Sequence, residues 1–307
     1  MNNLPSFLFG FKYMCLNILL GVALVLVSGI PCIVYANQEK QDRETGETGV
    51  QQLAKKLQNP VAKLTNFQFQ NNFEHKLGAD GKGYRYTLRF QPVIPMSLND
   101  NWNFIFRPII PYIYQHKVIG NASQEGLGDI QVENTFSPVK RGPGGITWGL
   151  GPIFLFPTAT SDHLGSQKYG IGPNGIILKQ SGPWTALILA NHTWSYAGND
   201  KRNDVSLTYL QPVLAHSTKK GFTISVSSES TYDWKGENWT VPFICTTSQI
   251  LPFGKQYISV GLGGIYYLRA PTSSPEWGIR LNVTFLFPEG LHWIKKTDKK
   301  GEVTNER

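Results

Sequence analysis

The sequence is poor in cysteine and in long apolar runs. Of its three cysteines, only Cys245 follows the apolar N-terminal segment, so the rest of the chain can form no intrachain disulfide. After residue 36 no stretch of 18 consecutive apolar residues occurs, so we expect no transmembrane helix there. An exported chain without disulfides needs another source of stability, and a closed β-barrel has one in its complete hydrogen-bond ladder.

Concentrated charge is also missing. The formal net charge is +8, but lysine and arginine are spread along the chain. A nucleic-acid binder would gather them on one stripe, so we expect no nucleic-acid partner. The six histidines are scattered without the spacing of metal ligands. The pattern gives no reason to expect a metal or another cofactor.

What the chain does contain is a regular alternation of apolar and polar residues. From about residue 67 to Phe287, strand-length runs place an apolar residue at every second position. In residues 84–91, for example, apolar and aromatic residues alternate with arginine, threonine and glutamine. A soluble sandwich would bury the apolar face against a second sheet. A barrel in a bilayer turns that face outward and keeps the polar face in its lumen, and this is our interpretation.

Turn residues divide the alternating region into about twelve segments. The expected strands are 65–77, 83–95, 101–115, 126–137, 146–157, 168–179, 183–194, 204–215, 221–231, 239–250, 256–268 and 276–287. Short turns follow every second strand and generally longer loops follow the others, as in bacterial outer-membrane barrels. An even number of strands puts both termini on one side, the periplasm. The expected fold is all-β, an antiparallel transmembrane β-barrel of about twelve strands.

The ends of the chain differ from this region. Lys12, an apolar run and a small-x-Ala sequence at Ala36 are typical of a signal peptide, with an uncleaved membrane anchor as the alternative. We divide the chain into a signal peptide (1–36), a polar periplasmic segment or small plug (37–63), the outer-membrane β-barrel (64–288) and a polar C-terminal tail (289–307). Within the second part, Val50 to Leu57 are expected to form a short amphipathic helix, because Asn59-Pro60 forbids its continuation.

Two residue types mark the expected strands. Aromatic residues occur near strand ends, as in the girdles of membrane barrels: Trp102, Trp148, Tyr169, Trp184, Trp194, Trp239, Tyr267 and Trp277. Prolines lie inside expected strands, where each removes a donor from the ladder: Pro92, Pro108, Pro111, Pro152, Pro173, Pro212 and Pro242. The number of prolines predicts an irregular barrel with some short strands.

Several motifs occur in order along the chain. They are Leu57-Gln58-Asn59-Pro60-Val61-Ala62, Phe69-Gln70-Asn71-Asn72, Gln91-Pro92-Val93-Ile94-Pro95, Trp102-Asn103, Gly126-Leu127-Gly128-Asp129, Phe156-Pro157-Thr158-Ala159-Thr160, Gly182-Pro183-Trp184, Ala190-Asn191-His192-Thr193-Trp194-Ser195, Glu229-Ser230-Thr231-Tyr232-Asp233-Trp234 and Pro275-Glu276-Trp277-Gly278. Together they resemble a bacterial outer-membrane β-barrel family commonly labelled "neuromedin U". They are similar to outer-membrane proteins associated with meta-pathway phenol degradation, some of which are called transporters.

The resemblance covers nearly all of residues 50–288. It implies an outer-membrane barrel with a transport role and brings no catalytic motif. The chain departs from many such barrels at its end, because they finish at a terminal phenylalanine whereas Phe287 is internal. The resemblance therefore does not say how the barrel-assembly machinery recognises this chain.

The parity of the strands assigns residues to the lumen. A charged side chain that faces lipid at mid-depth costs roughly 2–4 kcal/mol, so charged residues on the polar face belong inside. The charged candidates are Arg85, Arg89, Arg107, Glu133, Glu229 and Arg280, with Thr87, Gln91, Asn103, Gln131, Ser225, Ser227 and Asn282 beside them. Four arginines against two glutamates predict a basic lumen that favours anionic or aromatic solutes. Alternatively, the charges pair across a nearly closed lumen.

These observations predict a channel or transporter for small solutes in the outer membrane of a Gram-negative bacterium, gated by loop 158–167 or by residues 37–63. The expected partners are outer-membrane lipid and lipopolysaccharide, the barrel-assembly machinery and the solutes. The first alternative is a structural or surface-interaction barrel with a filled lumen.

The second alternative is an outer-membrane hydrolase, which would need serine and histidine together at the lipid-facing wall. His192 and Ser195 supply these residue types, and Asp162-His163 lies in an expected outer loop. No phospholipase or protease motif accompanies them, so we do not expect an enzyme.

Overall fold

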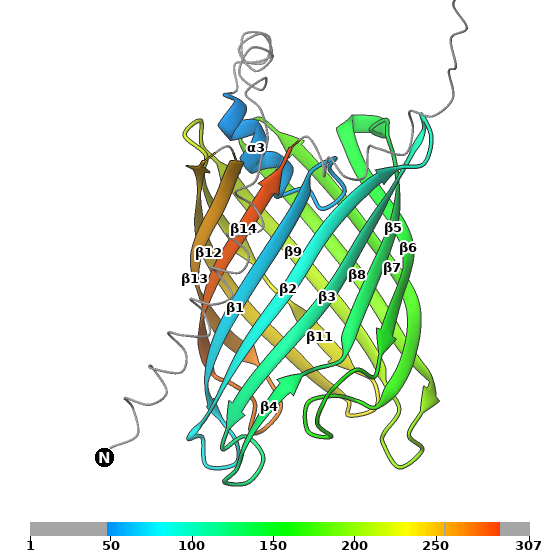
Figure 1. Ribbon diagram of the computed structural model, residues 1–307, viewed down its shortest axis with the longest axis vertical. Coiled ribbons are helices and arrows are strands. Elements are labelled where there is room, and N and C mark those ends of the chain that lie inside the picture. Colours follow the sequence, from blue (N-terminus) through cyan, green and yellow to red (C-terminus); the bar gives the residue numbers. More distant parts are fainter. Residues whose placement is uncertain (1–47, 255, 289–307) are drawn as a thin grey trace, which may run out of the picture. The chain divides into compact units, whose positions relative to one another are not determined.

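The computed structural model describes residues 48–254 and 256–288. The expected signal peptide, residues 37–47 of the next segment and the tail 289–307 lie outside the described residues. The described chain contains the helix α3 (Gly49–Leu57), the 3₁₀ turn η1 (Pro143–Gly145) and one antiparallel sheet (Figure 1). Its strands are β1 (Thr65–Leu77), β2 (Gly83–Ser97), β3 (Trp102–His116), β4 (Ser123–Leu127), β5 (Ile130–Pro138), β6 (Ile146–Phe156), β7 (Lys168–Ser181), β8 (Trp184–Gly198), β9 (Ser206–Ser217), β10 (Phe222–Ser227), β11 (Ser230–Asp233), β12 (Asn238–Phe253), β13 (Gln256–Arg269) and β14 (Trp277–Phe287).

The sheet closes on itself. β1 pairs with β14 from Thr65, opposite Phe287, to His75, opposite Trp277, and the other strands pair with their neighbours in chain order. β4 and β5 both pair with β3, and β10 and β11 both pair with β9 and β12. Each of these two pairs is one interrupted strand, so the fourteen segments make twelve strands. The closed antiparallel twelve-strand barrel confirms the expected fold. No helix of the described chain is long and apolar enough to cross a membrane.

The strand boundaries agree with the expected ones to within four residues. The expected irregularity is also present. Pro152 lies opposite Pro173, where neither residue can donate to the ladder. The register between β12 and β13 shifts at Pro242. In the gap between β10 and β11, the N–H of Ser228 donates to the carbonyl of Pro212. Prolines therefore accompany several of the interruptions.

The two ends of the barrel differ in their connections. One end, here called the short-turn end, carries the turns 98–101, 182–183 and 218–221; the opposite, long-loop end carries residues 157–167 and 199–205. Most of the aromatic residues expected near strand ends lie at one of these two ends of the barrel. Trp102, Trp148 and Trp184 lie at the short-turn end; Tyr169, Trp194, Trp239 and Trp277 lie at the long-loop end. Tyr267 is the exception, because it faces the lumen, where its hydroxyl donates to Glu74.

The helix α3 forms where the sequence predicted an amphipathic helix. The side chain of Thr48 caps its N-terminus by accepting from the N–H of Gln51. Two lysines in the last turn interact favourably with the helix dipole. The helix lies at the short-turn end (Figure 1). There Gln51 donates to the carbonyl of Ser217, and Gln180 of β7 donates to the carbonyl of Lys55.

An apolar cluster lies inside the barrel near the short-turn end. It comprises Val61, Val93, Ile105, Ile176, Leu178, Leu187 and Leu189, with Tyr209 and Val213 against it. A second cluster joins Leu53 and Ala54 of the helix to Leu64, Ile250 and Leu286. The expectation of polar inward positions therefore fails near the short-turn end. The reason is that the segment after α3 inserts Val61 there, so inward apolar side chains pack against it instead of meeting water.

Candidate functional site: the barrel lumen

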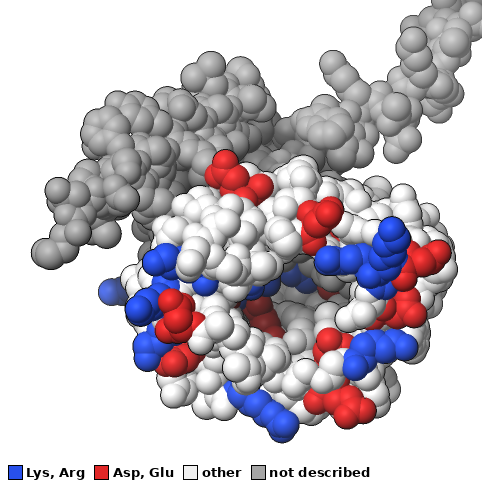
Figure 2. Space-filling model, turned by 90° about the horizontal axis from the view of Figure 1, so that it is seen from below, with Lys and Arg blue, Asp and Glu red and all other residues white. Residues whose placement is uncertain are grey.

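One cavity of about 880 Å³ extends along the inside of the barrel. Leu57 and Pro60 line it near the short-turn end, and Leu164 and Ser166 line it near the long-loop end. Among the described strands, all except β4 and β7 contribute to its wall. Figure 2, seen from the long-loop end, shows the hollow of the barrel with charged side chains at its rim and within it. The cavity thus reaches from one end of the barrel to the other.

The wall of the cavity is not basic, contrary to the expectation. Its charged residues are Arg85, Arg89, Arg107 and Arg280 against Glu74, Asp129, Glu133, Asp204, Glu229 and Asp233. Four positive and six negative side chains leave a formal charge of −2. The count of charges from sequence was too positive because it omitted Glu74 and the three aspartates, which also reach the lumen.

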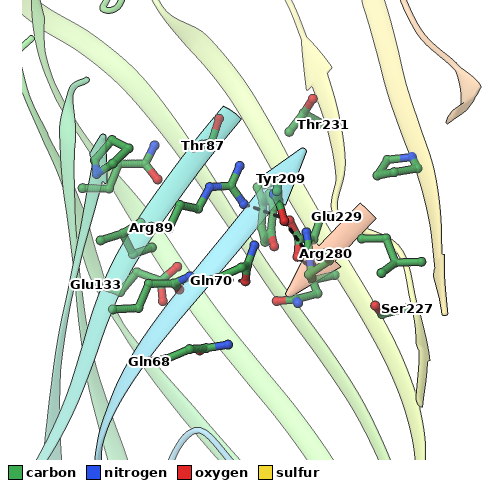
Figure 3. A pocket seen from close by; sticks show the side chains of 18 of the residues that line it. Gln68, Gln70, Thr87, Arg89, Glu133, Tyr209, Ser227, Glu229, Thr231 and Arg280 are labelled. Atoms are coloured by element: carbon green, nitrogen blue, oxygen red, sulfur yellow. Dashed lines mark hydrogen bonds and ion pairs between the residues drawn. The ribbon is translucent and has the colours of Figure 1, made fainter. Parts of the chain in front are cut away.

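Glu229 bridges the lumen between two arginines. It lies in the gap between β10 and β11, where its Oε2 accepts from Nη1 of Arg89 on β2 at 3.0 Å. Its Oε1 accepts from Nη1 of Arg280 on β14 at 2.5 Å. Figure 3 shows the three side chains converging from separate strands, with Tyr209 beside them. One carboxylate therefore connects distant parts of the wall.

Amide side chains complete the surroundings of these arginines. Nε of Arg280 donates to Oδ1 of Asn72 at 2.8 Å. The amide of Gln70 lies between the two guanidinium groups, and in one orientation its oxygen accepts from Arg280 at 3.1 Å and from Arg89 at 3.2 Å. The rigid fork of a guanidinium suits such a multidentate arrangement. Arg280 is only 6% exposed, so its charge is matched mainly by these groups.

A second ion pair lies on the other side of Arg89. Arg107 of β3 and Glu133 of β5 are direct cross-strand neighbours, and Nη1 of the arginine lies 3.0 Å from Oε2 of the glutamate. Nη2 of Arg107 also donates to Gln91 at 2.6 Å, and Asn191 of β8 donates to Glu133 at 3.3 Å. This geometry matches the alternative in which the charges pair.

All six charged side chains expected in the lumen line the cavity. Five of them form the two networks just described: Arg89, Arg107, Glu133, Glu229 and Arg280, here called the charged layer. Arg85 lies apart from it and donates to Gln115 at 3.0 Å. The role of these residues in binding a solute stays a prediction. The sequence did not reveal Tyr209, which packs against both the charged layer and the apolar cluster.

His192 and Ser195 do not form the serine–histidine pair that a hydrolase would need. Ser195 bonds to Asp204, which lines the lumen. His192 instead bonds to Thr208 at 2.7 Å and lies 3.4 Å from Ser206. Its ring contacts that of Trp194 at a tilt of 43°, and Trp194 is half-exposed at the long-loop end. His192 is thus part of an aromatic girdle. Within residues 48–254 and 256–288 no group of three or more potential ligands could hold a metal ion.

Comparison with known proteins supports the architecture. The sequence matches no protein-family model and no curated protein. The structure is similar to the crystal structure of an outer membrane channel from Pseudomonas putida F1, with a TM-score of 0.57 and 12% sequence identity over 73% of this chain and 93% of that chain. The chain therefore has the fold of an outer membrane channel. At 12% identity the similarity extends to the fold and not to the solute.

Proposed function

We propose that this chain is a channel of the bacterial outer membrane that passes small polar solutes. The main support for this proposal is the cavity of about 880 Å³, which reaches from Pro60 near one end of the barrel to Ser166 near the other. Fold similarity to an outer membrane channel supports this proposal. In this arrangement the short-turn end and α3 face the periplasm, and the girdles contact lipid and lipopolysaccharide.

The pairing of the charged layer favours uncharged solutes over anions. Arg89, Arg107 and Arg280 each have a carboxylate partner within 3.0 Å. The remaining wall is rich in amides that can both donate and accept, including Gln68, Gln131 and Gln211. A small neutral molecule with hydroxyl or amide groups can exchange its water for these side chains. The transport role that the sequence resemblance implies belongs to the same proposal.

A structural barrel with a filled lumen is the second candidate function. The observation that favours it is the combination of cross-lumen ion pairs with the apolar cluster around Val61, both of which reduce free space. Such a barrel would stiffen the wall and present its outer loops to partners, and it would pass no solute.

Liposome swelling separates the two candidates. Purified, folded protein in vesicles should admit uncharged polyols and sugars at rates that fall steeply with size, and should admit singly charged anions no faster than cations of similar size. A barrel proven to be folded that admits none of these solutes contradicts the channel. A strong preference for anions would contradict the role given to the paired arginines.

A further inference from the structure

The connection between β6 and β7, residues 157–167, is held against the interruption between β4 and β5. Thr160 satisfies both backbone groups of Leu127, as a neighbouring strand would. The N–H of Thr160 donates to the carbonyl of Leu127 at 3.0 Å, and Oγ1 of Thr160 accepts from the N–H of Leu127 at 3.1 Å. Oγ1 of Thr158 accepts from the N–H of Ile130 at 2.9 Å and donates to the carbonyl of Gly128 at 3.0 Å. The loop thus satisfies backbone groups that the broken strand leaves free.

The carboxylate of Asp129 accepts hydrogen bonds from both ends of the loop. Its Oδ1 accepts from the N–H of Ala159 at 3.2 Å, and its Oδ2 accepts from the N–H and the hydroxyl of Ser166 at 2.6 and 2.7 Å. Bonds from neutral donors to a carboxylate are about twice as strong as neutral pairs. One side chain therefore closes residues 159–166 into a loop of fixed shape.

The interruption is shaped to receive this loop. Gly126 has a φ of +147°, which side-chain-bearing residues rarely adopt, and a Cβ there would lie 2.0 Å from Oγ1 of Thr160. A Cβ at Gly128 would lie 3.2 Å from the carbonyl oxygen of Leu164 and 3.0 Å from Ile113. These contacts explain the two glycines of the Gly126–Asp129 motif and the threonines of the Phe156–Thr160 motif, because the two motifs bind each other.

The same loop forms part of the wall of the cavity. Leu164 is 8% exposed, and it lines the cavity with Gly165 and Ser166. The neighbouring connection 199–205 supports it from the other side, where Arg202 donates to the carbonyl of Gly165 at 2.8 Å. The loop is therefore anchored to two parts of the barrel while it faces the lumen.

We propose that residues 157–167 form a fixed constriction that sets the size limit of the lumen at the long-loop end, and that Asp129 is its positioning residue. This inference rests on the proposed channel function. It assigns the size limit for entering solutes to the loop, whereas the charged layer determines charge selectivity.

The first experiment measures the position of the loop without any transport. Leu164→Cys is placed in a chain whose other cysteines are replaced by serine, and its labelling by a membrane-impermeant maleimide is timed. Asp129→Ala should speed labelling at least about tenfold, since it removes three hydrogen bonds to a carboxylate. Independently, Thr160→Val should speed labelling about fivefold, since it removes the one bond from the N–H of Leu127. Asp233→Ala is the matched control. It also removes a carboxylate from the cavity wall, but that carboxylate accepts from Lys235 within its own turn.

The second experiment measures the size limit with uncharged solutes in liposome swelling, using the same variants without Leu164→Cys. Asp129→Ala and Thr160→Val should admit larger sugars than the parent and the Asp233→Ala control do. Faster labelling together with a larger size limit supports the inference. Unchanged labelling in both folded variants overturns it, and so does faster labelling with an unchanged size limit. A parent that admits no solute contradicts the channel itself, and this failure is recognisable because the labelling result does not depend on passage.

Discussion

Arg89 and Glu229 are joined by an ion pair of 3.0 Å that crosses the barrel lumen. Counted around the closed sheet, β2 and β11 are five strands apart in one direction and seven in the other, so the two side chains come from nearly opposite walls. A solute must pass beside this pair. The charged side chains that could make the lumen selective therefore also connect its opposite walls.

Replacing Glu229 with glutamine should shift the ion preference of the channel toward anions. The variant Glu229→Gln leaves Arg89 and Arg280 without their carboxylate, so the reversal potential in a KCl gradient should move toward that of chloride. The free energy of unfolding should fall by about 3 kcal/mol, because a largely buried charge loses its partner. Urea unfolding checks this value. Glu276→Gln is the control, since its ion pair with Lys76 is exposed. An unchanged reversal potential would show that the arginines do not control ion passage.

Arg107 and Glu133 should show energetic coupling. In a double-mutant cycle with Arg107→Met and Glu133→Gln, the double variant should be more stable than the sum of the single changes predicts, by about 1–2 kcal/mol. The exposed pair Lys76 and Glu276, taken through the same cycle, should give about 0.5 kcal/mol or less. Equal coupling energies for the two pairs would mean that the lumen screens charge as effectively as bulk water.

Displacing Val61 should widen the short-turn end. Val61→Asp puts a carboxylate among apolar side chains, which is unfavourable without a partner, so residues 58–64 should leave the lumen and the single-channel conductance should rise. Lys63→Asp alters an exposed position of the same segment and should leave the conductance close to that of the parent. Equal conductance in parent and Val61→Asp proteins, both shown to be folded, would mean that this segment does not limit the current.

The ion pair between Lys168, at the start of β7, and Asp204, in the connection 199–205, should resist mild acid. The hydrogen bond from Lys168 lowers the pKa of Asp204 below its ordinary value of 3.8. A carboxylate whose pKa is lowered by folding stabilises the folded form above the unfolded pKa, and this contribution is lost as pH falls through the folded value. Carboxyl NMR should therefore place the midpoint for Asp204 below 3.8, and Lys168→Met should raise it. A midpoint at or above 3.8 in the parent would show that the pair does not form.

Much of the fold could be predicted from local patterns. Alternation fixes which side chains share a face of a strand, so Arg85, Arg89 and Arg107 were correctly placed on the lumen side, and turn residues located the strands. Periodicity does not report how a strand is interrupted. The breaks after Leu127 and Ser227 depend on what packs into them, and at Leu127 this is a loop from another part of the chain.

The partners within the lumen were less predictable. Which carboxylate meets Arg280 depends on the order and stagger of strands around the closed barrel, and Glu229 reaches it from three strands away. Ile176 and Leu178 lie in the strand expected at 168–179, which is too apolar and glycine-rich for parity to assign its inward face. They point inward because Val61 enters the lumen beside them, and no local pattern shows this insertion.

Single-channel recording from the refolded protein in a planar bilayer, with a KCl gradient, tests the central claim most directly. An open lumen with paired arginines and a wall of formal charge −2 predicts a steady, reproducible conductance without anion preference, with the reversal potential at zero or on the potassium side. Consistent silence from protein shown to be folded would contradict the open lumen and favour the structural barrel.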